Sequence, residues 1–392
     1  MKKQNEIKNI LQMKSYEARL KAESQSPINY SKVVPSCETK FSIVSLFSGA
    51  GGLDLGFDLA GIEATLGQKA ATRAFLSKNY YQLFRDQSLF RTIYANDIFP
   101  EALETFKSNM HPSTYCHLKN IQRIKEFPKA DIVLGGFPCP GFSEAGPRLV
   151  DDERNFLYLH FIRCLMDTQP KFFVAENVKG MLTLGGGEVF KQIKEDFEAA
   201  GYNVKTKLLN ARDFGVPQTR ERVIIVGVRT DLDFHYSFPE PTHGPKAGLK
   251  PYVTLKDAIG DIETDPGFFY QGGYSSMYMS RNRKRSWHEQ SFTIQASGRQ
   301  APLHPSGEPM RKINKDLWEF PDSINEHRRL SIKEVARIQT FPDWFEFSMG
   351  ENKKTSKNGR IDKVYKQIGN AVPISLAKVI SLPIANYLKI SG

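Results

Sequence analysis

The feature that most constrains the fold of this chain is a short apolar run that leads directly into a glycine-rich turn. Residues 43–47 (Ile-Val-Ser-Leu-Phe) have the composition of a buried strand, and the Ser-Gly-Ala-Gly-Gly that follows at 48–52 lets the chain turn tightly into a helix. Such a unit opens many α/β folds, where the backbone can approach a bound ligand closely. The spacing Gly-x-Gly-Gly differs from the Gly-x-Gly-x-x-Gly of dinucleotide-binding proteins, so this turn alone leaves the ligand open.

Runs of the same kind recur along the chain and alternate with helical patterns. Apolar, β-branched segments lie at 131–134, 172–175, 204–209 and 223–228. Between the runs at 172–175 and 204–209, residues 188–200 place Phe190, Ile193 and Phe197 on one face of a helix. This alternation predicts an α/β domain built around a mostly parallel sheet.

The chain divides into regions of different texture. We expect a helical extension and linker at 1–40, a large domain at 41–230 plus 345–392, and a smaller domain at 231–344. The smaller domain is rich in Pro, Gly, Tyr and basic residues, so irregular and β structure is expected there until a helix begins near Ser331. A strand-like run at 364–368 and a last helix at 373–388 should pack back on the large domain.

Charge and cysteine usage narrow the class of protein. Lysine and arginine outnumber aspartate and glutamate by 54 to 43, and the net charge of +11 suits a polyanionic partner such as nucleic acid. The four cysteines show neither a disulfide framework nor a Cys-x-x-Cys motif, so we expect no metal site. The polar N-terminus and the lack of an apolar run of about 18 residues predict a cytoplasmic protein.

One cysteine lies where a nucleophile would be useful. In Gly-Gly-Phe-Pro-Cys-Pro at 135–140, Cys139 follows a predicted strand and has a proline on each side. The two rings restrict the backbone, and Pro140 steers Cys139 away from helical geometry. A free cysteine is more often buried and unreactive, so this motif alone leaves both roles open.

Polar groups also adjoin two other apolar runs. Glu176 follows the run at 172–175, where a carboxyl group can act as an acid or simply cap the next element. Arg220 and Arg222 precede the run at 223–228. Their guanidinium groups can hold a carbonyl oxygen or a phosphate, or can lie in a solvated turn.

Two aspartates could serve a bound nucleoside. Asp97 ends the strand-like Tyr-Ala-Asn-Asp-Ile at 94–98 and could accept both hydroxyl groups of a ribose, or could cap a helix before Pro100. Asp131 precedes the apolar residues 132–134 and could accept an adenine amino group, or could be a turn residue.

Taken in order, these segments resemble the motifs of the C5-cytosine-specific DNA methyltransferase family. The matching segments are Phe-Ser-Gly-Ala-Gly-Gly at 47–52, Pro-Cys at 138–139, Glu-Asn-Val at 176–178, Gln-x-Arg-x-Arg at 218–222, Arg-Arg-Leu-Ser through Gln-Thr-Phe-Pro at 328–342, and Gln-Ile-Gly-Asn-Ala-Val-Pro at 367–373. The basic stretch at 279–300 further resembles the recognition domains of restriction-modification enzymes that methylate GGCC-type sites. Two features depart from the family pattern: Pro140 stands where Gln is usual, and residues 67–93 form a longer stretch than the family norm.

The resemblance implies a Rossmann-like methyltransferase domain that uses S-adenosylmethionine, releases S-adenosylhomocysteine and acts on a cytosine flipped out of double-stranded DNA. It makes Cys139 the nucleophile toward carbon 6, places Glu176 at ring N3 and Arg222 at the O2 oxygen, and adds Arg220 to the catalytic residues. It assigns to the cofactor pocket Phe47, Gly49, Ala50, Gly51, Gly52, Leu53, Asp97, Ile98, Asp131, Ile132, Pro138, Asn370 and Val372.

The smaller domain is expected to recognise the DNA site, and the segment from Gly141 to about Arg154 to close over the flipped base. DNA contacts are expected from Ser143, Arg281, Arg283, Arg285, Gln295, Arg299 and Gln300. Arginine and glutamine commonly pair with guanine and adenine edges, although a basic solvated loop is the plainer alternative. The resemblance also implies a monomer that protects DNA from a cognate restriction endonuclease.

Two other functions stay open at this point. An RNA cytosine methyltransferase would share the chemistry, but its usual form lacks a recognition domain as long as residues 231–325. A catalytically silent DNA-binding regulator would keep the fold without the chemistry. The presence of Cys139, Glu176 and Arg222 argues against such a regulator.

Overall fold

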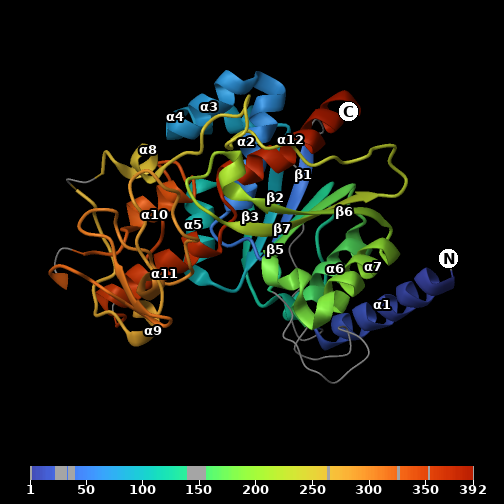
Figure 1. Ribbon diagram of the computed structural model, residues 1–392. Helices are drawn as coiled ribbons and strands as arrows, with labels where there is room; N and C mark the ends of the chain where they lie inside the picture. The colour runs from blue at the N-terminus through green and yellow to red at the C-terminus, as the bar shows by residue number, and fades with distance from the viewer. Residues whose placement is uncertain are drawn as a thin grey trace.

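The computed structural model describes residues 2–22, 33, 40–138, 156–262, 265–324, 327–351 and 354–391. Its centre is a seven-stranded sheet in the order β3-β2-β1-β4-β5-β7-β6 (Figure 1). The strands are β1 (Phe41–Leu46), β2 (Phe90–Asp97), β3 (Tyr115–Leu118), β4 (Ile132–Gly135), β5 (Phe172–Val178), β6 (Tyr202–Asn210) and β7 (Glu221–Arg229). Strands β1 to β5 are parallel and β7 is antiparallel to both of its neighbours. The predicted mostly parallel sheet is therefore confirmed.

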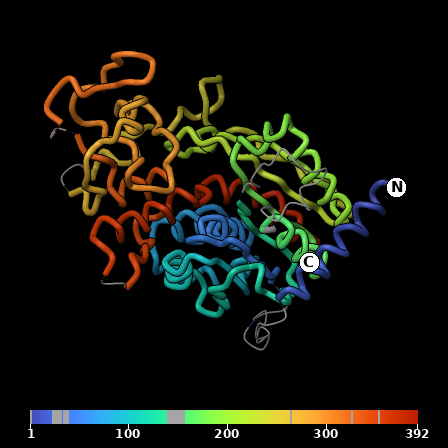
Figure 2. Tube along the Cα trace, turned by 90° about the horizontal axis from the view of Figure 1, so that it is seen from below, coloured from blue at the N-terminus to red at the C-terminus, as the bar shows by residue number. Residues whose placement is uncertain are grey.

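The central strands are apolar on both faces because helices cover both. In β5, Phe173 and Ala175 contact one apolar cluster, and Phe172 and Val174 contact another, as the alternation of side chains along a strand requires. One face is covered by α1 (Lys2–Lys21), α6 (Phe156–Thr168) and α7 (Glu188–Ala199), and the other by α2 (Gly52–Leu66) and α12 (Ile374–Ser391) (Figure 1). Helix α1 runs along the outer side of α6 and α7 (Figure 2).

Helices α2 and α12 approach each other at a glycine. A Cβ atom on Gly56 of α2 would lie only 2.3 Å from the Cβ atom of Ala377 of α12, so a larger residue would force the helices apart. This close approach brings the connection before α12 against the start of α2. There, a Cβ atom on Gly52 would lie 2.6 Å from the carbonyl oxygen of Val372.

The predicted strand at 364–368 is wrong, because these residues lie within α11 (Lys357–Asn370). Ile361, Val364, Tyr365 and Ile368 recur at helical spacing and are all buried, so one helix face produces the dense apolar run that suggested a strand. The predicted helices at 188–200 and 373–388 are confirmed as α7 and α12. An 18-residue window within 357–391 has a mean hydropathy of 1.5, apolar enough by composition to cross a membrane, but 61% of that window is buried inside the fold.

Short helices complete the structure. They are α3 (Gln68–Leu76), α4 (Lys78–Phe84), α5 (Pro100–Asn109), α8 (Leu255–Ile259), α9 (Ser276–Met279) and α10 (Ile332–Ile338). Helices α3 and α4 occupy the long stretch at 67–93, where Trp344 stacks on Tyr81 and donates a 2.9 Å hydrogen bond to the carbonyl oxygen of Phe75. Helix α10 begins at its cap Ser331, as predicted. Helices α8 and α9 were not predicted, because four or five residues are too few to show a period.

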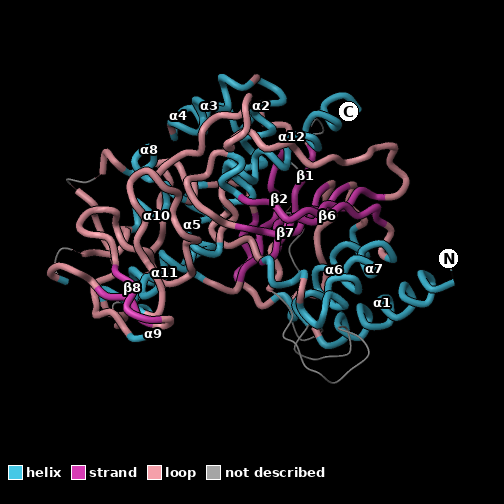
Figure 3. The backbone as a smooth tube through the Cα atoms, viewed as in Figure 1, coloured by secondary structure: helices cyan, strands magenta, loops and turns pink. Residues whose placement is uncertain are grey.

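Residues 231–330 are mostly loop (Figure 3), with one hairpin of β8 (Arg311–Asn314) and β9 (Leu317–Glu319). Their separate apolar cluster is small and consists of Tyr278, Leu303 and Met310. The buried Arg329 supplements it, since its guanidinium carbon lies 4.5 Å and 4.9 Å from the ring centroids of Tyr274 and Tyr278. Cation–π contacts therefore supplement the apolar packing of this region.

Candidate active site

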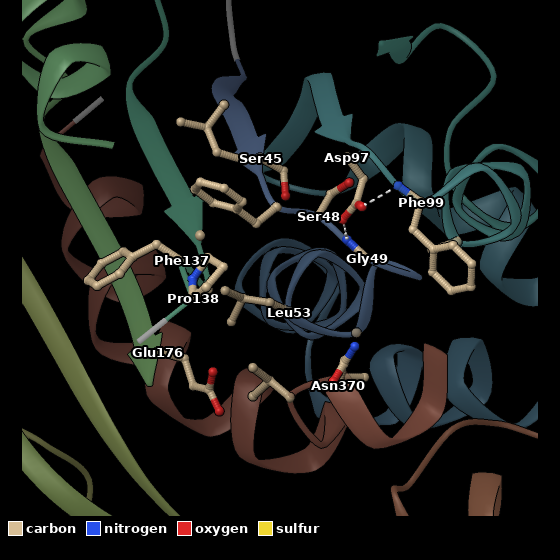
Figure 4. A pocket seen from close by; sticks show the side chains of 18 of the residues that line it. Ser45, Ser48, Gly49, Leu53, Asp97, Phe99, Phe137, Pro138, Glu176 and Asn370 are labelled. Carbon is tan, nitrogen blue, oxygen red and sulfur yellow. Dashed lines mark hydrogen bonds between the residues drawn. The ribbon is translucent and has the colours of Figure 1, made fainter. Parts of the chain in front are cut away.

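A pocket of about 700 Å³ lies at the carboxyl edge of the parallel strands (Figure 4). Its wall comes from residues that follow β1, β2, β3 and β4, from the end of β5, from the start of β7 and from the connection between α11 and α12. Ligands in open α/β sheets bind at this edge, and the volume lies within the range of roughly 300–1,000 Å³ usual for ligand pockets. The motifs that are far apart in sequence therefore meet in one place.

The glycine-rich turn and Asp97 form one end of the pocket. Asp97 accepts hydrogen bonds of 2.8 Å from the backbone amides of Gly49 and Phe99, which orient its carboxylate (Figure 4). Burial raises the pKa of Asp97, although these backbone hydrogen bonds oppose the shift. Phe47 and Gly49 both have positive φ values, 53° and 54°, and for Phe47 this is a strained conformation of the kind found at ligand sites.

The structure places most of the predicted cofactor residues in this pocket. The predicted residues that line it are Phe47, Gly49, Gly52, Leu53, Asp97, Ile98, Pro138, Asn370 and Val372. Ala50 and Gly51 are predicted members that do not line it. Both are buried in the turn behind the wall, where a Cβ atom on Gly51 would lie 2.9 Å from the Phe106 ring.

The predicted cofactor contacts of Asp131 and Ile132 are corrected, because both residues lie at the amino ends of the parallel strands, whereas the pocket lies at their carboxyl ends. Asp131 precedes β4 and accepts hydrogen bonds from the backbone amide and hydroxyl of Ser42, at 2.9 Å and 3.0 Å. Its other oxygen pairs with Lys171 at 3.0 Å. Ile132 is fully buried inside β4. Asp131 therefore joins the amino ends of β1 and β4, and its position does not support an adenine contact.

Asn120 and Ile121, which were not predicted, line the pocket. They follow β3 and begin a short 3-10 helix, η3 (Ile121–Arg123), which the Asn120 side chain caps by accepting from the Gln122 amide. The sequence pattern does not reveal these residues, because β3 is four residues long and only partly buried, and so lacks an apolar run. The sequence signal that could have identified this site is a polar residue followed by an apolar one, Asn120 and Ile121, after a short strand.

Glu176 and Arg222 form the other end of the pocket. Arg222 Nε lies 2.7 Å from Glu176 Oε1, and both side chains are largely buried. The next residue, Asn177, donates a 2.9 Å hydrogen bond to the carbonyl oxygen of Phe137, so the end of β5 is tied to the segment that follows β4. Glu176 lies across the pocket from Asp97 (Figure 4). A carboxyl group and a guanidinium group are thus paired at one end, where they can bind the polar edge of a base.

Arg220 lines the same pocket, but its guanidinium is held by protein and not left free for a substrate. It donates to the carbonyl oxygens of Ile294, Gly369 and Ala371 at 3.1 Å, 2.8 Å and 3.1 Å. Burial and the neighbouring Arg222 lower its pKa to about 9, so it remains protonated at neutral pH. The structure does not support the predicted direct catalytic contact, because Nη1 and Nη2 donate to backbone carbonyl oxygens and Nε is buried without a hydrogen-bond partner.

Cys139 and Ser143 lie outside the described residues. Pro138, which is covalently bonded to Cys139, is exposed and lines the pocket. The two cysteines within the described ranges are Cys116 and Cys164, and burial raises their pKa values to about 11 and about 12. Neither is suited to form a thiolate near neutral pH.

The predicted DNA-contacting residues divide into two groups. Arg281, Gln295 and Arg299 are exposed. Arg283 does not fit the predicted DNA contact, because it is buried and donates to the Tyr278 carbonyl oxygen and to Gln300 Oε1. The Gln300 side chain is therefore also used within the protein. Arg285 is half-buried, pairs with Glu289 at 2.7 Å and stacks over Phe292. The basic run therefore contributes structural contacts as well as an exposed surface.

Comparison with known proteins identifies related sequences along most of the chain. The family model described as C-5 cytosine-specific DNA methylase matches residues 41–386. The Type II methyltransferase M.BspRI of Lysinibacillus sphaericus is 65% identical over 348 residues, which are 89% of this chain and 82% of that protein. The Type II methyltransferase M.BsuRI of Bacillus subtilis is 60% identical over 384 residues, 98% of this chain and 88% of that protein.

Solved structures support the same fold. A DNA modification methyltransferase encoded within a prophage of E. coli superposes with a TM-score of 0.58 at 20% identity, covering 90% of this chain and all of that one. A DNMT2 of Spodoptera frugiperda superposes with a TM-score of 0.54 at 17% identity, covering 88% and 100%. At these identities the likeness shows a shared fold.

Proposed function

Because the chain belongs to the C-5 cytosine-specific DNA methylase family, we propose that it transfers a methyl group from S-adenosylmethionine to carbon 5 of a cytosine in a specific, GC-rich palindromic duplex site. The observation that carries the proposal is that Asp97 with Gly49 and Glu176 with Arg222 form opposite ends of one pocket. Pro138, the residue bonded to Cys139, lines the same pocket. One end suits the cofactor and the other suits the base.

The glycine-rich end fits S-adenosylmethionine. A Cβ atom on Gly49 would meet nothing within 4 Å, so the turn leaves open space beside the Asp97 carboxylate. Asp97 would accept the ribose hydroxyl groups, Asn120 would face the adenine, and Asn370 would face the methionine part. When bound, this cofactor supplies an electrophilic methyl group carried on a sulfonium centre.

The chain's own residues would activate the cytosine. The Cys139 thiolate would add to ring carbon 6, and the displaced electron pair would make carbon 5 nucleophilic. Glu176 would hold a proton at ring N3, and Arg222 would hold the O2 oxygen and help to balance the charge on Glu176. After methylation, loss of the carbon 5 proton and of the Cys139 thiolate would restore the aromatic ring. The base must leave the duplex first, because a stacked cytosine exposes neither face of carbon 6.

The wider setting follows from the same proposal. We assign residues 41–230 plus 345–392 to catalysis and 231–344 to target recognition, with Arg281, Gln295 and Arg299 as the candidate DNA contacts because they are exposed. Ser143 remains a candidate contact from the sequence alone. The enzyme would act as a monomer in the cytoplasm and protect DNA from a cognate restriction endonuclease.

Bisulfite sequencing of DNA from cells that express the chain tests reaction and target together. We expect one protected cytosine within one short palindrome, and Cys139→Ser should abolish the protection. Duplex DNA with 5-fluorocytosine at that position should form an adduct that survives denaturation, because no proton can leave carbon 5. Methylation of tRNA but not of duplex DNA would instead favour the RNA enzyme, and unmodified DNA with retained DNA binding would favour the regulator.

A further inference from the structure

Arg220 contacts both the predicted recognition segment and the pocket wall. We propose that Arg220 is a positioning residue that couples DNA-site reading by residues 294–300 to the catalytic pocket. The inference deepens the proposed function and rests on the assignment of that segment to DNA recognition. We call residues 294–300 the recognition segment.

The backbone of the recognition segment is held at its first residue by buried side chains. Ile294 donates its amide to Gln218 Oε1 at 2.8 Å and its carbonyl oxygen accepts from Arg220 at 3.1 Å. Gln218 in turn donates to Gln339 Oε1 at 2.9 Å. Gln218, Arg220 and Gln339 are each at most 1% exposed, so water does not compete for their hydrogen-bonding groups.

The same side chains hold the wall on which Asn370 sits. Arg220 donates to the carbonyl oxygens of Gly369 and Ala371, the two neighbours of Asn370. Gln339 donates to Ile368 at 2.7 Å and to Ala371 at 3.2 Å. Arg220 is also two residues before Arg222 at the start of β7, so both side chains depend on one short piece of backbone.

The rest of the recognition segment is docked just as closely. A Cβ atom on Gly369 would lie 2.3 Å from the carbonyl oxygen of Gln295, so the two backbones are in direct contact. Asp362 of α11 accepts from the Gly298 amide at 2.7 Å and from the Ser297 hydroxyl at 3.0 Å. Gln295 and Arg299, the exposed members, thus project from a backbone that is fixed against the pocket.

This arrangement gives Arg220 a mechanical role. A shift of the recognition segment on a wrong DNA sequence would pull on the Ile294 carbonyl, and Arg220 would transmit the shift to Asn370 and Arg222. On a correct DNA site, Ile294, Asn370 and Arg222 would keep their positions. The arginine suits this role because its planar fork can bond several oxygens at fixed angles, which a lysine cannot do.

The test compares methylation rates on a duplex with the cognate site and on duplexes with one base pair of the site changed. The measured ratio is the rate on the cognate site divided by the rate on a changed site. Arg220→Lys should lower this ratio by about tenfold or more, because the shift caused by a changed site would no longer reach Asn370 and Arg222, and small displacements of catalytic groups have large kinetic effects. Arg229→Lys is the matched control on the other end of β7, where the side chain is partly exposed and pairs with Asp231. Its ratio should stay within about twofold of the original.

Two further variants keep the outcome decisive. Gln339→Met removes the hydrogen bonds from Gln218 and to the carbonyl oxygens of Ile368 and Ala371 without changing the charge. It should also lower the ratio, so it provides the test if Arg220→Lys fails to fold. A merely destabilised enzyme loses both rates together, so equal losses with an unchanged ratio in the folded variants would overturn the coupling. Arg299→Ala and Gln295→Ala test the assignment of the segment itself. If neither changes the ratio, the recognition role fails; if they change it and Arg220→Lys does not, only the coupling fails.

Discussion

The Asn177 side chain donates a 2.9 Å hydrogen bond to the carbonyl oxygen of Phe137 and so joins the end of β5 to the segment that leads to position 139. Asn177 is 4% exposed, and its own Oδ1 accepts from the Val178 amide. Neither contact involves a substrate. The relationship instead fixes the end of β5, which carries Glu176, against the segment Phe137–Pro138 that follows β4.

Asn177→Asp should lower the methyl-transfer rate at saturating substrates, because a carboxylate facing the Phe137 carbonyl oxygen repels it. We expect a loss of at least about tenfold, with the cofactor Kd little changed, since one removed buried hydrogen bond is worth roughly 1–3 kcal/mol. Asn203→Asp on the exposed part of β6 is the control and should be neutral. Single-turnover kinetics and cofactor titration separate the two quantities, and a pure change in Kd would contradict the assignment.

Asp97 and Asp131 should respond differently to the same change. Asp97→Asn removes a ribose acceptor and should weaken cofactor binding by about tenfold or more. Asp131→Asn should leave the Kd within about twofold, because Asp131 bonds Ser42 and Lys171 at the far edge of the sheet. Its effect should appear as a lower unfolding temperature. Calorimetric titration of S-adenosylhomocysteine checks both, and equal losses of affinity would show that the far-edge assignment is mistaken.

Gly52→Ala should impair the cofactor end of the pocket, because the added methyl group would lie 2.6 Å from the Val372 carbonyl oxygen. The clash separates the start of α2 from the connection before α12 and should both destabilise the fold and raise the cofactor Kd. Gly180→Ala is the matched control, since its Cβ would meet nothing within 4 Å. Thermal unfolding and cofactor titration measure the pair. Identical behaviour of the two variants would refute the close approach.

Asp54 should make stability depend on pH. Burial raises its pKa from 3.8 to about 7, although Ser45 and Thr92 donate to it and oppose the shift. The folded protein therefore binds this proton more tightly than the unfolded chain. The resulting stabilisation is fully present below about pH 4 and is lost as the pH rises through about 7.

Asp54→Asn should remove up to about 1.4 kcal/mol per pH unit of this slope between about pH 4 and 7, the value for one proton. Urea unfolding at several pH values measures it. Asp58, whose pKa burial raises to about 6, keeps part of the slope in the variant. Asp233→Asn, at an exposed position, is the control. Parallel stability curves for Asp54→Asn and the unchanged protein would exclude a titrating Asp54.

Local patterns were sufficient where one face or both faces of an element are apolar. The sheet strands at β1, β4, β5, β6 and β7 and the helices α7 and α12 appear as runs or repeats in the sequence. The pattern misled at 364–368, because a helix buried along one face shows the same density of apolar residues as a strand. The four-residue, partly buried β3 shows no apolar run, and Asn120, which follows it, was missed for that reason.

The sequence by itself determined the family, the α/β class and the chemical types in the site, because these depend on the identity and order of residues. Only the tertiary structure decided which of two similar residues serves the pocket. Asp97 lies at the carboxyl edge of the sheet and Asp131 at the amino edge, although each adjoins a strand. Arg222 is paired with Glu176, whereas Arg220, two residues away, binds three backbone carbonyls. Strand direction and burial distinguish the two residues of each pair, and the local sequence predicts neither property.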